Sequence, residues 1–166
     1  MKRIFFFVLV AVSISCNRQK PLGNKFFDFD SSDYYSLNLN DRQISKLNLE
    51  NATASTIISG YYPESINEIS EISKLGEIGY TKTTLNAKQV KELSQIFREN
   101  SNGDFEFAAC LPIYRDIFVL KKNSKIVGIV KLCYECGQAS FRGTKANTEN
   151  FGANEEFLKI NLVLKR

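Results

Sequence analysis

The chain has 166 residues, of which 43% are hydrophobic and 24% charged, with a formal net charge of +4 and no histidine. These values are typical of one folded domain with a substantial core, and they exclude a disordered polyelectrolyte. Basic residues are spread along the chain, and no cluster exceeds short pairs such as Lys121–Lys122. The charge pattern therefore predicts no nucleic-acid partner.

Residues 1–15 have the pattern of a secretory signal peptide. Lys2 and Arg3 form a basic start, and an apolar run follows from Ile4 to Ile14. This run is shorter than the roughly 20 residues needed to span a bilayer. The alternative interpretation is a short buried strand or the first turn of a helix.

Cys16 is a candidate for lipid attachment. The sequence SISC at 13–16 is similar to a bacterial lipobox, although Ser13 stands where leucine is usual. Two or more acyl chains, such as palmitate, give stable membrane attachment. Plain secretion, with Cys16 free or removed, is the alternative. We expect a signal peptide at 1–15, a lipidated tether at 16–25 and a single α+β domain at 26–166. The protein would lie in the bacterial cell envelope, facing away from the cytoplasm, with the membrane and an unknown envelope protein or ligand as partners.

The first expected element of the domain is a strand near residues 34–39. Tyr35, Leu37 and Leu39 recur with the two-residue period of a half-buried strand. Residues 42–59 fit no single period.

Two helices are expected next, near residues 64–75 and 86–99. The first has isoleucines at spacing three, Pro63 in its first turn and Gly76 as a left-handed cap. The second begins at Asn86, a favoured N-cap residue. Between them, residues 77–85 predict a short strand or connection.

A β-hairpin is predicted at about residues 113–136. Two runs rich in Ile, Val, Leu and Phe flank a polar turn at Asn123–Ser124, and residues 105–110 are expected to precede them as part of the same sheet. Residues 137–154 are rich in Gly, Ser, Thr and Asn and predict a loop. Alternation at 158–164 fits a strand, but the flanking Asn154 and terminal basic residues favour a helix. The expected fold is therefore α+β, a small and mainly antiparallel sheet packed with two or three helices.

Hairpin register brings cysteines together. If a two-residue turn pairs Lys122 with Lys125, then Asp116 faces Lys131 as a cross-strand charge pair. Cys110 then lies beside Cys136, and a one-residue bulge would place the two directly opposite each other. In an oxidising compartment these two form our first choice of disulfide, worth about 2–4 kcal/mol. Cys133 would lie on the order of 13 Å away and remain unpaired, as a small buried side chain.

Two other chemistries remain open for the thiols. Redox catalysis is the first, because Cys133 and Cys136 have CxxC spacing. That motif usually opens a helix, whereas here it ends a predicted strand. Zinc binding is the second, with Cys110, Cys133 and Cys136 as ligands and a fourth from Glu135 or Asp104.

Three aspartates precede the first strand. Asp28, Asp30 and Asp33 are candidate cation ligands, but their spacing does not match a calcium loop. A solvated acidic patch is the favoured interpretation. No resident cofactor is expected, with zinc as the alternative, and no catalytic residue is assigned.

The block at residues 110–136 resembles the core of an uncharacterised family of small bacterial lipoproteins and secreted proteins. Cys110, Cys133, Glu135 and Cys136 match its pattern, in which a β-hairpin ends in Cys-x-Glu-Cys. Together with the helical stretch at 63–99, the resemblance covers a little over half of the chain. Pro112 stands one place early, and Arg115 occupies a position where the family often has histidine. The resemblance implies the fold and the compartment, and it brings no established activity. We therefore expect a non-catalytic binding module, with a thiol-redox or metal-dependent protein as the alternative.

Overall fold

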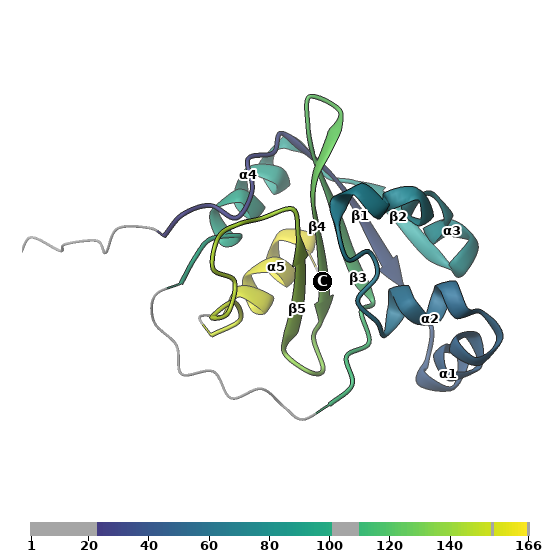
Figure 1. Cartoon of the computed structure of the whole chain (residues 1–166). Coiled ribbons are helices and arrows are strands. Elements are labelled where there is room, and N and C mark those ends of the chain that lie inside the picture. Colours follow the sequence, from purple (N-terminus) through teal and green to yellow (C-terminus); the bar gives the residue numbers. More distant parts are fainter. Residues whose placement is uncertain (1–22, 101–109, 154, 166) are drawn as a thin grey trace, which may run out of the picture.

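A five-stranded antiparallel sheet forms the centre of the structure, a computed structural model that describes residues 23–100, 110–153 and 155–165 (Figure 1). The strand order is β2-β1-β3-β4-β5. The strands are β1 Ser31–Leu37, β2 Tyr80–Thr84, β3 Asp116–Lys122, β4 Lys125–Cys133 and β5 Gln138–Arg142. The expected α+β class is confirmed. The predicted signal peptide, Cys16, Asp104, the expected strand residues 105–109 and the expected cap Asn154 lie outside the described residues.

Helices cover both faces of the sheet (Figure 1). One layer is formed by the helices between β1 and β2, and α4 and α5 form the other. The helices of the described residues are α1 Asp41–Glu50, α2 Ala52–Ile58, α3 Leu75–Ile78, α4 Ala87–Ile96 and α5 Glu156–Leu164, with a 3₁₀-helix η1 at Ile66–Lys74.

Alternation along β3 divides the core into two parts. Phe118 and Leu120 pack in the cluster with α4 and α5, whereas Ile117 and Val119 pack in the cluster with α1, α2 and α3. Successive side chains of a strand point to opposite faces, so this central strand is buried on both sides. Its continuous apolar sequence follows from that position.

Asparagine caps define where the helices begin. Asn40 and Asn86 each accept a hydrogen bond from the backbone N–H three residues on, and Gln43 and Gln89 complete the two capping boxes. The N-cap predicted at Asn86 is confirmed. The segment that the sequence left ambiguous, 42–59, consists of α1 and α2.

The α-helix expected at 64–75 is wrong in its helix type and in the position of its C-terminal cap. The chain forms the 3₁₀-helix η1, kinked at Glu68, and then the single α-turn of α3. A 3₁₀-helix has 3.0 residues per turn, which matches the isoleucine spacing of three. Gly76 lies inside α3, and Gly79, with φ of 110°, is the left-handed cap.

The predicted loop at 137–154 is also wrong in part. Residues 138–142 form β5, an edge strand that pairs antiparallel with β4. The sequence of β5 is polar because its residues are only half-buried. The helix favoured for the C-terminal segment is confirmed as α5.

The hairpin of β3 and β4 turns at Asn123–Ser124 as predicted, but its register differs. Lys122 pairs with Lys125, and then an irregularity leaves Val127 without a partner and shifts the remaining pairs. Asp116 therefore faces Leu132, and the expected pair of Asp116 with Lys131 is wrong. Because the register shifts by one residue, each residue of β3 beyond the irregularity pairs with the β4 residue next to the one expected.

Lys131 is instead a buried cation that ties the α2 layer to the sheet. It is 2% exposed, and its Nζ donates to the carbonyl oxygens of Ile57, Gly60 and Tyr62 at 2.7, 2.8 and 3.0 Å. The same Nζ lies 4.4 Å from the centre of the Tyr114 ring. Burial lowers the pKa of Lys131 to about 7, and repulsion by a nearby arginine, Arg142, adds to this effect. The carbonyl bonds and the ring face supply the stabilisation that an ammonium needs at this depth.

The substitution Lys131→Met tests this role. It leaves three carbonyl groups at the end of α2 without their donor, so we expect the free energy of unfolding to fall by about 2–4 kcal/mol. Urea denaturation followed by circular dichroism measures the change. The control is Lys125→Met, at an exposed position of the same strand, for which we expect a change within about 0.5 kcal/mol. Equal effects of the two substitutions would contradict the role.

Candidate functional site

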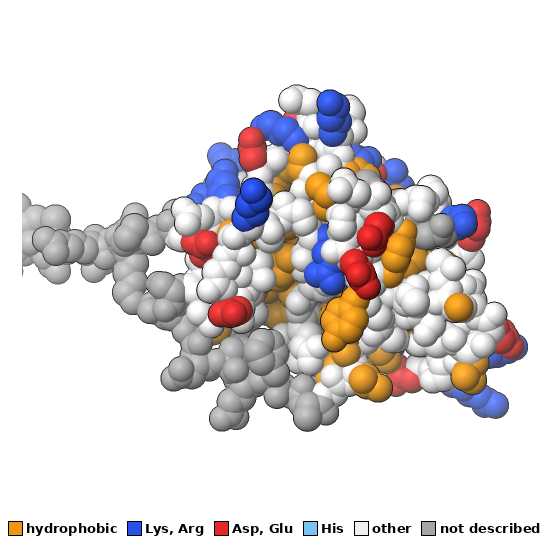
Figure 2. Space-filling model, in the orientation of Figure 1, with side chains coloured by type: hydrophobic (Ala, Val, Ile, Leu, Met, Phe, Trp, Pro, Cys, Tyr) orange, Lys and Arg blue, Asp and Glu red, His pale blue; other side chains and the backbone are white. Residues whose placement is uncertain are grey.

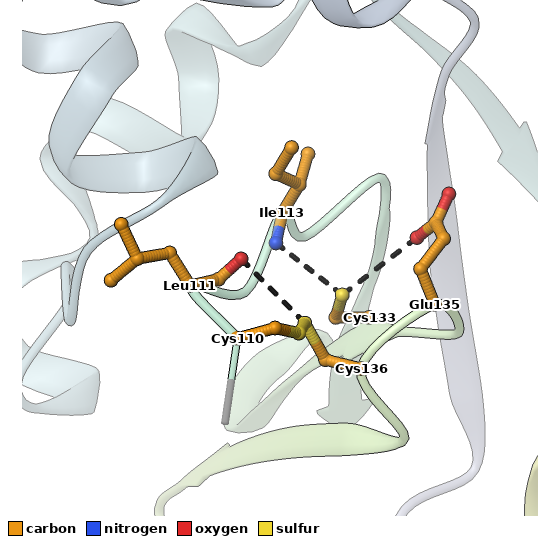
Figure 3. Close-up of a disulfide and its surroundings, with 6 residues drawn as sticks. All are labelled: Cys110, Leu111, Ile113, Cys133, Glu135 and Cys136. Carbon is orange, nitrogen blue, oxygen red and sulfur yellow. Dashed lines mark hydrogen bonds between the residues drawn. A yellow bond between two sulfur atoms is a disulfide. The ribbon is translucent and has the colours of Figure 1, made fainter. Parts of the chain in front are cut away.

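Three cysteines gather beside one end of the sheet (Figure 3). Cys110 and Cys136 lie at disulfide distance, with their Cα atoms 6.0 Å apart. This is the pair expected from the hairpin. It joins segments that are 26 residues apart in sequence.

The two partners come from irregular segments rather than from strands. Cys110 lies in the extended stretch before β3, and Cys136 lies in the turn between β4 and β5. The extended stretch is held in place at Tyr114. Its N–H donates to the Ile58 carbonyl at 2.8 Å, and its carbonyl accepts from the Tyr80 hydroxyl at 2.6 Å.

Cys133 ends β4 and is a free thiol, 1% exposed. It packs in one buried cluster with Cys136 and Tyr114. The sequence placed Cys133 about four strand residues from the disulfide, and this is wrong because the chain turns immediately after Cys133. Cys133 and Gln138 pair across that turn, which brings Cys136 back over the strand end.

Polar groups surround the Cys133 sulfur (Figure 3). The backbone N–H of Ile113 donates to Sγ at 3.3 Å, and Sγ lies 3.7 Å from Oε2 of Glu135, which can accept the thiol proton. In contrast, Cys136 Sγ lies 3.6 Å from the carbonyl of Leu111, a contact without a hydrogen bond because a disulfide sulfur has no proton. Cys133 is thus the sulfur with both a donor and an acceptor.

Arg115 connects this site to α1. Its Nε lies 3.3 Å from Oε1 of Glu135, and its Nη2 lies 2.6 Å from Oδ1 of Asp41. A further N–H donates to the carbonyl of Leu39. The residue that stands where the resembled family often has histidine therefore orients the carboxylate beside Cys133.

The alternative zinc set of Cys110, Cys133, Cys136 and Glu135 is brought close together. However, the sulfurs of Cys110 and Cys136 are paired with each other as a disulfide. The Glu135 carboxylate contacts Arg115 and Cys133. Within the described residues, no group of three or more His, Cys, Asp or Glu side chains is placed to hold a metal ion.

The candidate cation ligands Asp28, Asp30 and Asp33 do not converge. Asp28 pairs with Lys122 at 3.0 Å, and Asp30 accepts from the backbone N–H of Asn123 at 2.9 Å. Asp33 is only 5% exposed. The structure distributes these carboxylates among separate partners, so they form no shared cation site.

Asp33 lies in a charged groove that the sequence did not predict. Its Oδ2 is 2.5 Å from Nζ of Lys121 and 2.9 Å from Nζ of Lys82. Burial acts to raise the pKa of Asp33, but the hydrogen bonds with these two lysines outweigh it, and the pKa is lowered. The groove has a volume of about 440 Å³ and is floored by the sheet and walled by η1, which contributes Ser70 and Ser73.

The sequence did not predict the roles of Lys82, Lys121 and Lys131, because their partners are distant along the chain. One signal was present for Lys131, which interrupts the apolar run of β4 on the same face as Ile129. A cation at such a position needs buried acceptors. Nothing in the sequence indicates that these acceptors are carbonyls at the end of α2.

The chain matches no protein-family model, no curated protein and no solved structure. Among the helices of the described residues, none has the length and apolar character needed to cross a membrane.

The lowered pKa of Asp33 predicts how stability depends on pH. An aspartate in the unfolded chain has a pKa of about 3.9, so the folded chain holds fewer protons just below that value. The ion cluster therefore contributes stability above about pH 4 and loses it as pH falls through the lowered folded pKa. We expect Asp33→Asn to lower the free energy of unfolding by about 2 kcal/mol at pH 6 and by much less at pH 2.

Urea unfolding between pH 2 and pH 6 measures this difference. Asp28→Asn is the control, since Asp28 is exposed and pairs with one lysine at the surface. A wild-type advantage over Asp33→Asn that stayed constant across the range would contradict the assigned charge state.

Proposed function

We propose that the protein is a lipid-anchored bacterial envelope protein whose domain binds another envelope component without catalysing a reaction. The observation that carries this proposal is the segment 1–16, in which a basic start, an apolar run and the sequence SISC precede the folded domain. The cysteine pair at disulfide distance supports it, because disulfides persist in oxidising compartments such as the periplasm.

The start of the domain is consistent with a short tether. Lys25 forms an antiparallel bridge with Arg98, Asn24 Nδ2 donates to Glu99 at 2.7 Å, and Phe26 N–H donates to Phe97 at 3.0 Å. The chain is therefore fixed to the domain from Asn24 onwards. Asn24 is eight positions along the chain from Cys16, so the domain would lie within about 29 Å of its lipid.

The groove beside Asp33 is the best candidate for the binding site. Phe26 packs in the cluster with α4 and α5, whereas the groove lies on the other face of the sheet, beneath η1. The groove and Phe26, which is near the start of the described chain, thus lie on opposite faces of the sheet.

Basic and acidic side chains are interspersed on the face of the molecule drawn in Figure 2. In the groove, the local charge indicates the class of ligand. Lys82 and Lys121 together carry two positive charges against one on Asp33, and their side chains are 50% and 28% exposed. An ammonium has three N–H donors, and the bond to Asp33 uses one of them. The remaining donors, with the hydroxyls of the groove, suit an anionic group such as a carboxylate or a phosphate.

Substitution of the candidate lipid residue tests the anchor. We expect wild-type protein expressed with residues 1–166 in a bacterial host to fractionate with membranes, to lack residues 1–15 and to carry acyl chains on Cys16 by intact mass. We expect Cys16→Ser to leave the membrane fraction, because the acyl chains that supply the membrane affinity are absent. Cys133→Ser is the matched control and keeps the membrane location. Full-length, unacylated wild-type protein in the cytosol would contradict the anchor.

A second experiment tests the groove. Inorganic phosphate and acetate are titrated separately into the ¹⁵N-labelled lipoprotein in detergent, and backbone amide shifts are recorded. We expect saturable shifts at β1 and β2 for at least one anion, with a dissociation constant on the order of 1 mM, as for a small ligand held by few contacts. Lys82→Glu should weaken binding at least tenfold, and the control Lys125→Glu should not. Saturation by neither anion, or equal binding by the two variants, would contradict the groove assignment.

A further inference from the structure

The free thiol of Cys133 packs directly against Cys136, one of the two cysteines of the disulfide. We propose that Cys133 is the internal nucleophile of a thiol–disulfide exchange with the Cys110–Cys136 pair, and that this exchange makes Cys110 the attachment site for a disulfide-bearing molecule. The proposal goes beyond the binding function, since it assigns a covalent step to this site.

The cluster places the nucleophile next to its target. Cys133 and Cys136 are both buried and pack together with Tyr114, whereas Cys110 is exposed. Cys136 is therefore the sulfur that Cys133 can reach. The turn that follows Cys133 is tight, with the Gly137 N–H donating to the Tyr134 carbonyl at 3.3 Å. This four-residue reversal contains Cys136 and returns it to the end of β4, where it packs with Cys133.

The polar groups at Cys133 suit the attacking role. A thiolate, not a thiol, attacks a disulfide. The Cys133 thiol donates a hydrogen bond to Glu135 Oε2, and the Ile113 N–H donates to the sulfur, so a proton acceptor and a donor both lie against it. Arg115 pairs with Glu135, which reduces the repulsion between the carboxylate and the thiolate.

The first step conserves electrons within the molecule. Cys133 Sγ loses its proton to Glu135 and attacks Cys136 Sγ. The Cys133–Cys136 bond forms, the Cys110–Cys136 bond breaks, and Cys110 leaves as a thiolate. One disulfide replaces another, so no external oxidant or reductant is needed.

The second step uses the exposure of Cys110. Its thiolate attacks a disulfide R–S–S–R, forms a mixed disulfide with one half and releases the other half as a thiolate. The substrate class is therefore a small or protein disulfide. Because Cys136 and Cys133 are buried and joined to each other after the first step, the new bond is made at the accessible sulfur.

Peptide mapping after treatment with oxidised glutathione tests the proposal. The probe is added to the native lipoprotein in detergent, the reaction is stopped with acid, and free thiols are alkylated before digestion. We expect glutathione on Cys110 together with a Cys133–Cys136 linkage. We expect no adduct on Cys110 in Cys133→Ala, because the internal nucleophile is absent.

The rate of adduct formation distinguishes activation of the Cys133 thiol by Glu135 from a purely structural role of Glu135. Glu135→Gln should slow adduct formation about tenfold, since it removes the proton acceptor. Glu149→Gln changes an exposed carboxylate far from the sulfurs in sequence and should leave the rate unchanged.

Three outcomes would overturn the proposal: glutathione on Cys133, no adduct in the native wild type, or an adduct on Cys110 that forms equally fast in Cys133→Ala. Mapping of the wild type alone decides the linkage even if a variant folds poorly. The peptide that carries Cys16 is read separately, so a failed lipid anchor would appear as glutathione on Cys16 and would not be confused with a failed exchange.

Discussion

The buried ammonium of Lys131 is the interaction on which the arrangement of the α2 layer depends. A helix end leaves carbonyl groups without intrahelical partners, and here the carbonyls of Ile57, Gly60 and Tyr62 converge on one cation that projects from β4, two residues before the strand ends. Lys131 thus fixes the segment after α2 to the sheet, together with Arg142 of β5, which donates to the carbonyls of Tyr61 and Pro63. An apolar residue at this position would fill the space but would leave those oxygens buried without a donor, which is the more costly state.

The position of the three cysteines also depends on Lys131. Lys131 and Cys133 point to the same face of β4, two residues apart, and the ring of Tyr114 lies against the ammonium on one side and packs with Cys133 on the other. Tyr114 also bonds to Ile58 at the end of α2. The position of the extended segment that carries Cys110 therefore depends on the loop that Lys131 holds.

Local features of the fold were predictable from the sequence, and features set by distant contacts were not. The Asn86 cap and the Asn123–Ser124 turn depend on residues within one turn, and both were predicted. The shift at Val127 was not, because it depends on how β4 meets its neighbours. Gly128 lies against the ring of Phe27, where an added Cβ would come within 2.4 Å of a ring carbon, and nothing near Gly128 in the sequence indicates that close approach. The cysteine site likewise contains one feature that the sequence predicted and one that it did not. The disulfide pair was correctly expected, but the turn that returns Cys136 over Cys133 was not.

Buried polar side chains in proteins are costly unless they are paired, and in the described part of this chain the pairing explains most of them. Asp33 is held by two lysines, and Lys131 is held by three carbonyls. Cys133 differs, because packing alone would be served equally well by alanine or valine, which need neither an N–H donor nor a carboxylate beside them. Ile113 and Glu135 provide both, and Arg115 holds that carboxylate in place. A proton acceptor and an N–H donor beside a thiol that packs against a disulfide favour a chemical role for this sulfur over a filling role.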